Sequence, residues 1–182
     1  MKIKADKDII LHKVRVKSAR EIFDCMDRSR EFLREWLPFV DSTESYKDTE
    51  AYLKSLHHAR GAKKDLVFEI RHREKLAGII GMKDIDLVNN KAEIGYWLGK
   101  EFVGKGIMTR SCLALINYAF DELQLNKIKI SCAVENVRSC NIPKQLGFAF
   151  EGIERQGEYI NGKYQDLKVY SLLRKEWNAK QS

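Results

Sequence analysis

Three glycines fall within residues 99–106, between an apolar run that ends at Leu98 and a segment with helical periodicity. Glycine lets the main chain approach an anion closely, and the N–H groups at the start of a helix carry a partial positive charge. The stretch therefore indicates a cradle for a phosphate or diphosphate, built from the backbone N–H groups of residues 103–109. A glycine-rich loop that only turns a corner is the structural alternative.

Two familiar phosphate-binding motifs fit this stretch incompletely. Residues 99–105, GKEFVGK, match G-x-x-x-x-G-K, but Gly106 follows where a nucleoside-triphosphate loop needs Ser or Thr for magnesium. Residues 104–109, GKGIMT, supply two glycines of a dinucleotide fingerprint and place Thr109 at the third. The initial strand–turn and the acidic residue of a dinucleotide unit are also missing from their usual places. The sequence therefore disfavours the nucleoside-triphosphate loop, which lacks its Ser or Thr, and the dinucleotide fingerprint, which lacks these two features.

Hydrophobic periodicity and turn residues indicate the elements that hold this glycine turn. A strand over 91–98 precedes it, a helix runs from it to about Leu123, and a strand over 127–134 follows. Because a strand–helix–strand unit returns in the same direction, we expect its two strands to be parallel neighbours. The strands around this unit are expected to be antiparallel.

The other predicted elements lie on both sides of this unit. Those before it are a strand over 8–14, a helix from the capping box at 18–21 to before Pro38, a helix over 48–61 that Gly61 ends, and strands over 65–72 and 75–86. Those after it are a short helix within 138–147 and two strands, 148–160 and 163–173, around Asn161–Gly162. Asn-Gly between two such runs is a strong signal for a hairpin with a primed turn.

The composition is that of a globular chain of 182 residues, with 44% hydrophobic and 32% charged residues. A net charge of +7 favours an anionic ligand or partner, such as a phosphorylated cofactor, RNA or an acidic protein. The four cysteines, Cys25, Cys112, Cys132 and Cys140, form no C-x-x-C pair, which disfavours zinc and a disulfide framework and favours a reducing cytoplasm. No apolar run approaches the roughly 18 residues of a membrane span, and the N-terminus does not have the pattern of a signal peptide.

A second motif, NVRSCNIPKQLGF at 136–148, follows the strand–helix–strand unit. Together with the glycine turn it resembles the GNAT superfamily of acetyl-coenzyme A-dependent N-acetyltransferases. The first family motif, Q/R-x-x-G-x-G/A, corresponds to residues 103–108 here. The fixed positions of the second, N-x-x-S/A…G-F, are occupied by Asn136, Ser139, Gly147 and Phe148. Within the superfamily, AEIGYWL, GKGI, NVRS, LGFAFEG and QGEYINGKYQD look like the ribosomal-protein N-terminal acetyltransferases of the Rim type.

The chain departs from the family pattern at three positions. Val103 replaces the usual Gln or Arg, and Met108 replaces a small residue, but both positions act mainly through their backbone. Pro143 stands where many GNAT enzymes carry a tyrosine that protonates the departing thiolate. Rim-type enzymes also lack this tyrosine, and a serine is thought to serve instead. Because Pro143 has no N–H for the carbonyl of Ser139, we expect a distorted short helix there.

The resemblance implies one mixed α/β domain over residues 1–182, because the order of elements is similar to the GNAT fold over nearly the whole chain. That fold has a twisted, mostly antiparallel sheet with helices on both faces. Its fourth and fifth strands are parallel and splay apart, which opens a cleft for acetyl-CoA.

The resemblance also implies which residues carry the chemistry. Acetyl transfer to an amine needs a base for the ammonium proton, donors for the oxyanion and an acid for the thiolate, but no metal. Rim-type enzymes assign the base to a glutamate at the place of Glu158, near the hairpin tip, and Glu93 on the central strand is the alternative. Ser139 is the expected acid, with helix capping as its structural alternative. An acyl-cysteine at Cys140 is disfavoured, because nothing marks its thiol as activated.

Acetyl-CoA is the implied co-substrate. The residues expected to hold it are Val103, Gly104, Lys105, Gly106, Ile107, Met108, Thr109, Arg110 and Asn136, with Asn136 on the pantetheine arm. For Lys105 and Arg110, a solvated helix end is an equally good explanation. Trp36 and Glu93 are the residues expected at the acceptor site, and Trp36 alternatively packs as core.

The implied function is acetylation of a protein N-terminal α-amine, with a ribosomal protein as the expected acceptor. A small amine, such as a polyamine or an aminoglycoside, is the alternative acceptor. A basic nucleic-acid-binding module is an alternative from a different class, although no RNA-reading motif supports it. We expect a cytoplasmic homo-oligomer, with a dimer as the first assignment, that contacts neither a membrane nor nucleic acid directly.

Overall fold

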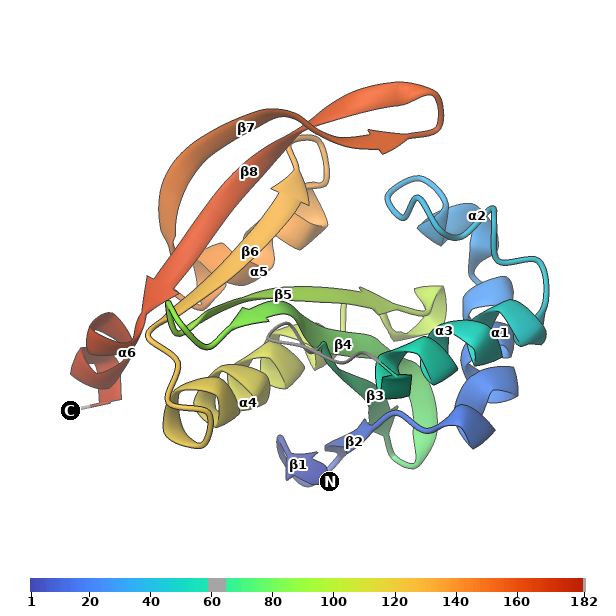
Figure 1. Ribbon diagram of the computed structural model, residues 1–182, viewed down its shortest axis with the longest axis horizontal. Helices are drawn as coiled ribbons and strands as arrows, with labels where there is room; N and C mark the ends of the chain where they lie inside the picture. Colours follow the sequence, from blue (N-terminus) through green and yellow to red (C-terminus); the bar gives the residue numbers. More distant parts are fainter. Residues whose placement is uncertain (59–64, 182) are drawn as a thin grey trace.

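The computed structural model describes residues 1–58 and 65–181 (Figure 1). Its strands are β1 (Lys2–Lys4), β2 (Ile9–Lys13), β3 (Leu66–His72), β4 (Lys75–Asp86), β5 (Lys91–Leu98), β6 (Lys127–Ala133), β7 (Ala149–Ile160) and β8 (Lys163–Leu173). Its α-helices are α1 (Ala19–Asp27), α2 (Arg30–Leu33), α3 (Tyr46–His58), α4 (Ile107–Asp121), α5 (Val137–Gln145) and α6 (Arg174–Gln181), and 3₁₀ turns cover Val16–Ser18 and Lys100–Phe102. Among the described residues, eight strands form one sheet in the order β1-β2-β3-β4-β5-β6-β8-β7.

Helices cover both faces of this sheet, because successive side chains of its inner strands point to opposite sides. Val67 of β3 packs in an apolar cluster with Ala19 of α1 and Leu53 of α3. The next residue, Phe68, packs instead in the largest apolar cluster, which contains Leu115 and other buried residues of α4. The predicted mixed α/β architecture with helices on both faces is confirmed.

β5 and β6 are parallel neighbours that separate after a short contact. They pair at three levels, Lys91 with Lys127, Ala92 with Ile128 and Glu93 with Lys129. Beyond Glu93, β5 remains paired with β4 up to Leu98, whereas β6 pairs on its other edge with β8. Figure 1 shows the two strands diverging, as the resemblance to the GNAT fold implies. In the described part of the chain, the β6-facing edge of β5 therefore lacks a sheet partner from Ile94 onwards.

The β7–β8 hairpin closes with the turn that the sequence predicts. Ile160 pairs with Lys163, and the two residues between them, Asn161 and Gly162, have positive φ angles of 52° and 76°. Positive φ at both central residues is the signature of a type I′ turn. Figure 1 shows this hairpin reaching toward the segment around α2.

The predicted helix before Pro38 is broken into α1 and α2. The side chain of Ser18 does not cap α1, because the preceding 3₁₀ turn has already brought Ser18 into helical angles (φ −85°, ψ −1°). The capping-box prediction is therefore wrong. The break falls at Ser29, whose hydroxyl accepts a hydrogen bond from the backbone N–H of Lys100 at 3.0 Å. The break thus ties the start of α2 to the glycine turn.

Two elements were not predicted, and one predicted helix end is not described. β1 is a three-residue edge strand, too short to show an alternating pattern. α6 has few apolar residues and is anchored by Trp177, whose indole N–H donates to Asn117 Oδ1 at 3.1 Å. α3 begins at Tyr46, and its predicted end at Gly61 lies outside the described residues. No helix within the described ranges is long and apolar enough to cross a bilayer.

Candidate active site

A cleft of about 830 Å³ lies beside the glycine turn. Its walls are the end of β5, the turn with the start of α4, the start of α5, and residues around the end of α2. Of the residues predicted to hold acetyl-CoA, those that line this cleft are Val103, Gly104, Gly106, Ile107, Met108, Thr109 and Asn136. Lys105 and Arg110 are not among its lining residues.

The glycine turn offers backbone N–H groups and open space to this cleft. Gly104 and Gly106 have φ angles of 78° and 66°, which residues with a Cβ rarely adopt. Gly106 is the N-cap of α4, and the first N–H groups of a helix have no acceptor within the helix. The first turn of α4 carries no acidic residue that would offset its positive end. A Cβ on Gly104 would meet no atom within 4 Å, so the space beside this residue is open.

Arg110 is engaged with the protein itself and not with the cleft. Its Nη1 lies 2.6 Å from Asp6 Oδ2. Its other nitrogens donate to the turn, Nη2 to the carbonyl of Lys105 at 3.1 Å and Nε to the carbonyl of Gly106 at 3.3 Å. Lys105 directs its ammonium toward the ring of Phe102, at 5.8 Å from the ring centroid. The structure therefore does not bring these two side chains to the cleft.

A second cavity, of about 290 Å³, adjoins the first. The residues that line both are Trp36, Leu37, Tyr96, Asn136 and Ser139. The charged residues that line only the second are Glu93, Glu154, Glu158, Lys83 and Lys129. An anionic ligand on the glycine turn and a cation among these carboxylates would thus meet at the shared residues. Within the described ranges, no group of three or more His, Cys, Asp and Glu side chains is placed to hold a metal ion.

An irregularity in the hairpin places Glu158 in this cavity. On β8, Leu167 pairs with Glu154 and Gln165 pairs with Glu158, so β7 carries extra residues between these two levels. A Cβ on Gly157 would lie 2.9 Å from Leu167 Cδ1, which explains glycine at this close approach. Such bulges bend a strand and re-aim its side chains.

The surroundings of Glu158 favour a neutral carboxyl more than water does. Burial raises the pKa of the Glu158 carboxyl, the charge of Lys83 lowers it, and the charge of Glu93 raises it. The net result is a pKa above the usual range for glutamate. Glu158 is therefore not the freely solvated hairpin carboxylate that is typical of an exposed turn.

Glu93 is held between two lysines. The register of the sheet pairs Glu93 with Lys83 on β4 and with Lys129 on β6. Their ammonium nitrogens lie 3.1 Å and 2.7 Å from its two carboxylate oxygens. Burial lowers the pKa of Lys129, but the hydrogen bond and charge of Glu93 outweigh it, so the pKa is raised overall. Both oxygens of Glu93 are thus committed to ion pairs.

Ser139 and Tyr96 form a hydroxyl pair where the two cavities meet. Because Pro143 has no N–H, the carbonyl of Ser139 receives no helical hydrogen bond. The phenol of Tyr96, on β5, donates to that carbonyl at 3.2 Å, and the hydroxyl of Ser139 donates to Tyr96 Oη at 3.3 Å. The helix continues past Pro143 to Gln145, without the interruption that its proline suggests. Burial raises the pKa of Tyr96 well above its usual value, so the phenol remains protonated.

Asn136, and not Ser139, caps α5. Its Oδ1 accepts a hydrogen bond from the backbone N–H of Ser139 at 3.0 Å. Capping, the structural alternative for the Ser139 side chain, is therefore wrong. Because the cap uses only the oxygen of the Asn136 amide, its NH₂ group can donate into the cleft.

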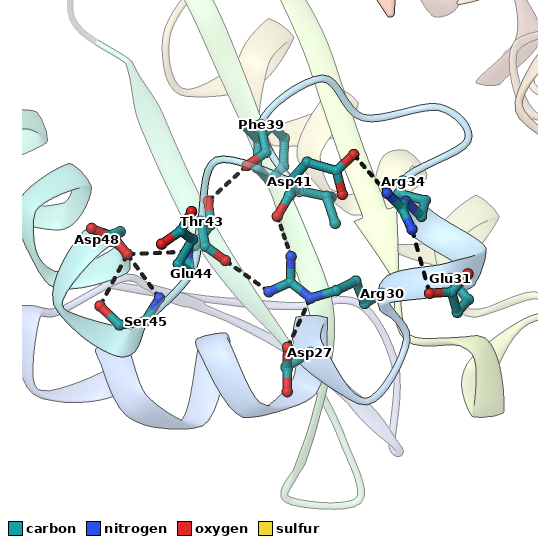
Figure 2. A network of polar contacts seen from close by, with 11 residues as sticks. Asp27, Arg30, Glu31, Arg34, Phe39, Asp41, Thr43, Glu44, Ser45 and Asp48 are labelled. Carbon is teal, nitrogen blue, oxygen red and sulfur yellow. Dashed lines mark hydrogen bonds and ion pairs between the residues drawn. The ribbon is translucent and has the colours of Figure 1, made fainter. Parts of the chain in front are cut away.

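The segment that carries Trp36 is braced by two arginines, as Figure 2 shows. Arg30 donates to the carbonyl oxygens of Val40 and Thr43, the latter at 2.7 Å. Arg34 pairs with Asp41 at 3.1 Å. These contacts fold residues 34–43 back on α2 and fix the wall that Trp36 and Leu37 form against both cavities.

The same segment touches the tip of the last hairpin. Asn161 Nδ2 donates to the backbone carbonyl of Arg34 at 3.0 Å. The hairpin that carries Glu158 and the segment that carries Trp36, which both contribute to the walls of the second cavity, are therefore in direct contact.

Several lining residues escaped the sequence reasoning. Tyr96 lies within AEIGYWL, and the missing N–H of Pro143 signals that the Ser139 carbonyl needs another donor, without indicating which residue supplies it. Phe32 and Arg138 also line the cleft, with the guanidinium carbon 5.6 Å from the ring centroid. Their meeting depends on how the chain places α2 and α5 on two sides of the cleft, which no local pattern predicts.

Comparison with known proteins gives relatives in sequence and in structure. A family model described as an acetyltransferase (GNAT) domain matches residues 8–149. Ribosomal-protein-serine acetyltransferase of Escherichia coli (strain K12) is 30% identical over 94% of this chain and 96% of its own. Spermidine N(1)-acetyltransferase of Vibrio cholerae is 28% identical over 84% and 86%. RimL, the ribosomal L7/L12 alpha-N-protein acetyltransferase, in complex with coenzyme A, gives a TM-score of 0.89 at 26% identity, covering 95% of this chain and 98% of RimL.

The family match spans most of the chain and contains both the glycine turn and the motif at 136–148. The relatives also confirm the resemblance to the Rim-type subgroup. The donor that this family uses, acetyl-CoA, agrees with the open glycine turn and the adjoining cleft. The chain belongs to the GNAT acetyltransferases and is an acetyl-CoA-dependent N-acetyltransferase.

Proposed function

We propose that the enzyme acetylates the N-terminal α-amine of a protein, and that the acceptor is a ribosomal protein. The observation that carries this proposal is the carboxylate-lined cavity that meets the donor cleft at Ser139 and Tyr96. A cationic α-amine can enter this cavity, whose three glutamates outnumber its two lysines and attract the positive charge. The relatives that are named for ribosomal proteins supply the acceptor class.

In the proposed complex, the diphosphate of acetyl-CoA rests on the N–H groups of residues 103–109. The pantetheine arm passes Asn136, and the thioester lies at the hydroxyl pair of Ser139 and Tyr96. The unpaired edge of β5 beyond Glu93 supplies further backbone hydrogen-bonding groups along the arm.

Glu158 is the proposed base. A protein α-amine has a pKa of about 7.7–8.0, so a carboxylate of modest basicity can accept its proton directly or through a water. The raised pKa of Glu158 brings its basicity closer to that of the amine. Glu93 has both oxygens in ion pairs with lysines and is therefore the weaker candidate.

Ser139 is the proposed proton donor to the departing thiolate, and a proton from solvent restores its hydroxyl. Its hydroxyl hydrogen points to Tyr96 Oη, and rotation about the Cβ–Oγ bond turns it toward a sulfur in the cleft. Tyr96 holds the backbone of Ser139 in place through the carbonyl that Pro143 leaves without a donor.

The test uses the purified enzyme, acetyl-CoA and synthetic N-terminal peptides of ribosomal proteins. Mass spectrometry should find one acetyl group on the α-amine, and no product from the same peptides with a blocked N-terminus and an internal lysine. A higher kcat/KM for spermidine than for every peptide would overturn the proposal in favour of a small-amine acceptor. In cells, loss of the enzyme should remove N-terminal acetylation from the same ribosomal protein.

A further inference from the structure

Arg110 and Asp6 form an ion pair that is hydrogen-bonded to the glycine turn, and we call this pair with its hydrogen bonds the bracket. Arg110 is one turn into α4, and its guanidinium donates to the carbonyls of Lys105 and Gly106 at 3.1 Å and 3.3 Å. The same guanidinium contacts Asp6 Oδ2 at 2.6 Å. One side chain thus grips two successive peptide groups of the turn and connects them to a residue more than 100 positions away in the sequence.

Asp6 is itself fixed. Its other carboxylate oxygen, Oδ1, accepts hydrogen bonds from the backbone N–H groups of Asp8 and Ile9, at 2.8 Å and 2.9 Å. Burial raises the pKa of Asp6, but these backbone bonds and Arg110 outweigh it and hold the pKa below its usual value. The carboxylate therefore stays charged and keeps the guanidinium in position throughout the neutral pH range.

Because a trans peptide group is planar, the direction of each carbonyl also fixes the direction of the N–H group in the same peptide. In such a peptide the C=O and the following N–H point in opposite directions. Because the carbonyls of Lys105 and Gly106 point to Arg110, the N–H groups of Gly106 and Ile107 point the other way. Gly106 and Ile107 line the donor cleft, whereas Arg110 does not.

We propose that Arg110, held by Asp6, is a positioning residue that aims the N–H group of Gly106 at the diphosphate of acetyl-CoA. The role is confined to this N–H, because the peptide that carries the Ile107 N–H is already oriented by the helical hydrogen bond from the backbone N–H of Arg110 to the Gly106 carbonyl. The inference rests on the proposed seat of the diphosphate on this turn. In this role Arg110 does not contact the phosphates itself, because its guanidinium is already bonded to Asp6 and to the two carbonyls.

A comparison of kcat/KM for two acetyl donors distinguishes this positioning role from a merely structural one. Acetyl-CoA carries the diphosphate, and S-acetylpantetheine carries the same thioester without it. In Arg110→Gln, kcat/KM for acetyl-CoA should fall by about 10- to 100-fold, the worth of one charge-assisted hydrogen bond. The kcat/KM for S-acetylpantetheine should stay within about twofold. Calorimetry with coenzyme A alone should show the same loss of affinity, without any acceptor, so failure of the acceptor assignment leaves this test intact.

Asp6→Asn distinguishes the bracket from direct phosphate binding. The near-isosteric change should weaken coenzyme A binding in the same donor-selective way, because it loosens Arg110. If Arg110 instead met the phosphates, its release from Asp6 would leave binding unchanged or tighter, and either result overturns the proposal. The matched control is Arg73→Gln, which removes an exposed Arg–Asp pair with Asp8, 3.3 Å apart, from the same end of the sheet. Equal losses with both donors in Arg110→Gln, or no loss with either, also overturn it.

Discussion

Replacing Glu158 by glutamine should disable the enzyme while leaving its fold and donor affinity intact. The amide has nearly the same shape as the carboxylate but cannot accept the proton of an ammonium. Glu158 lines the acceptor cavity and not the cleft beside the glycine turn, so calorimetry with coenzyme A should match the wild type.

The expected loss of turnover follows from the acceptor's own acidity. General-base catalysis is worth about 10²–10⁴ in rate. At pH 7.4, roughly a fifth to a third of α-amines are already neutral, given a pKa of about 7.7–8.0. We therefore expect Glu158→Gln to lie in the lower half of that range, about 10²–10³ in kcat, or about 3–4 kcal/mol. The deficit should shrink above about pH 8, where the amine loses its proton unaided.

Thermal stability gives a second measurement, in which Glu158→Gln should be favourable although it lowers turnover. The pKa of Glu158 is raised in the folded chain, so the folded state binds this proton more tightly than the unfolded state. Below the unfolded pKa of about 4.3 the group contributes nothing, and as pH rises through the folded pKa it comes to destabilise the fold. Glu158→Gln should therefore raise the Tm at pH 7 and leave it unchanged near pH 4, as calorimetric melting curves can show.

Glu93→Gln is the matched control. It leaves the amide between Lys83 and Lys129, so it should lower the Tm at neutral pH and reduce turnover less than Glu158→Gln. Loss of the negative charge of Glu93 also lowers the pKa of Glu158, which weakens the base only modestly. If Glu93→Gln abolishes turnover while Glu158→Gln remains close to wild type, the wrong carboxylate has been assigned as base.

The remaining predictions concern the donor turn, the hydroxyl pair, the hairpin tip and assembly. Gly106→Val should weaken coenzyme A binding severely by calorimetry, because valine rarely adopts a φ of 66° and its Cβ would lie 3.9 Å from Arg110 Nε, so the turn must change shape; unchanged affinity would remove the turn from the site. Tyr96→Phe should cost about 0.5–1.5 kcal/mol in chemical denaturation, since the part-buried Ser139 carbonyl loses its donor, and should lower kcat. Asn161→Gly should keep the turn but remove the hydrogen bond to the Arg34 carbonyl, which should raise KM for the peptide without changing donor affinity. An unchanged peptide KM would show that this hydrogen bond does not contribute to acceptor binding. A homo-oligomer remains a prediction, which light scattering at micromolar concentration can decide.

Local patterns were enough to predict the framework of the fold. The strand–helix–strand unit of β5, α4 and β6 follows from periodicity, and the Asn161–Gly162 turn follows from the φ angles that only a few residue types accept. The glycines at 104 and 106 could likewise be read as a cradle, because the anion-binding groups are backbone groups of consecutive residues. Such features depend on neighbours in the chain and are therefore visible in the sequence.

The parts that escaped prediction depend on residues far apart in the chain. Asp6 and Arg110 carry no shared motif, so Arg110 was assigned to the cofactor when its partner is the N-terminal segment. Glu158 was chosen by resemblance, but the irregularity between Glu154 and Glu158 that turns it into the cavity leaves no clear periodic signal. The break at Ser29 was missed because its hydroxyl is satisfied by the N–H of Lys100 and not by its own helix.

The brief contact between β5 and β6 also bears on how the molecule unfolds. Three residue pairs connect one half of the sheet, β1 to β5, with the other half, β6 to β8. Acetyl-CoA seated between these halves would touch the turn at the start of α4 and Asn136 at the start of α5, and would act as a non-covalent cross-link. Saturating donor at about 100 times its Kd stabilises a folded protein by about 2.7 kcal/mol. Amide hydrogen exchange in β7 and β8, and not only at the donor contacts, should therefore slow when coenzyme A binds.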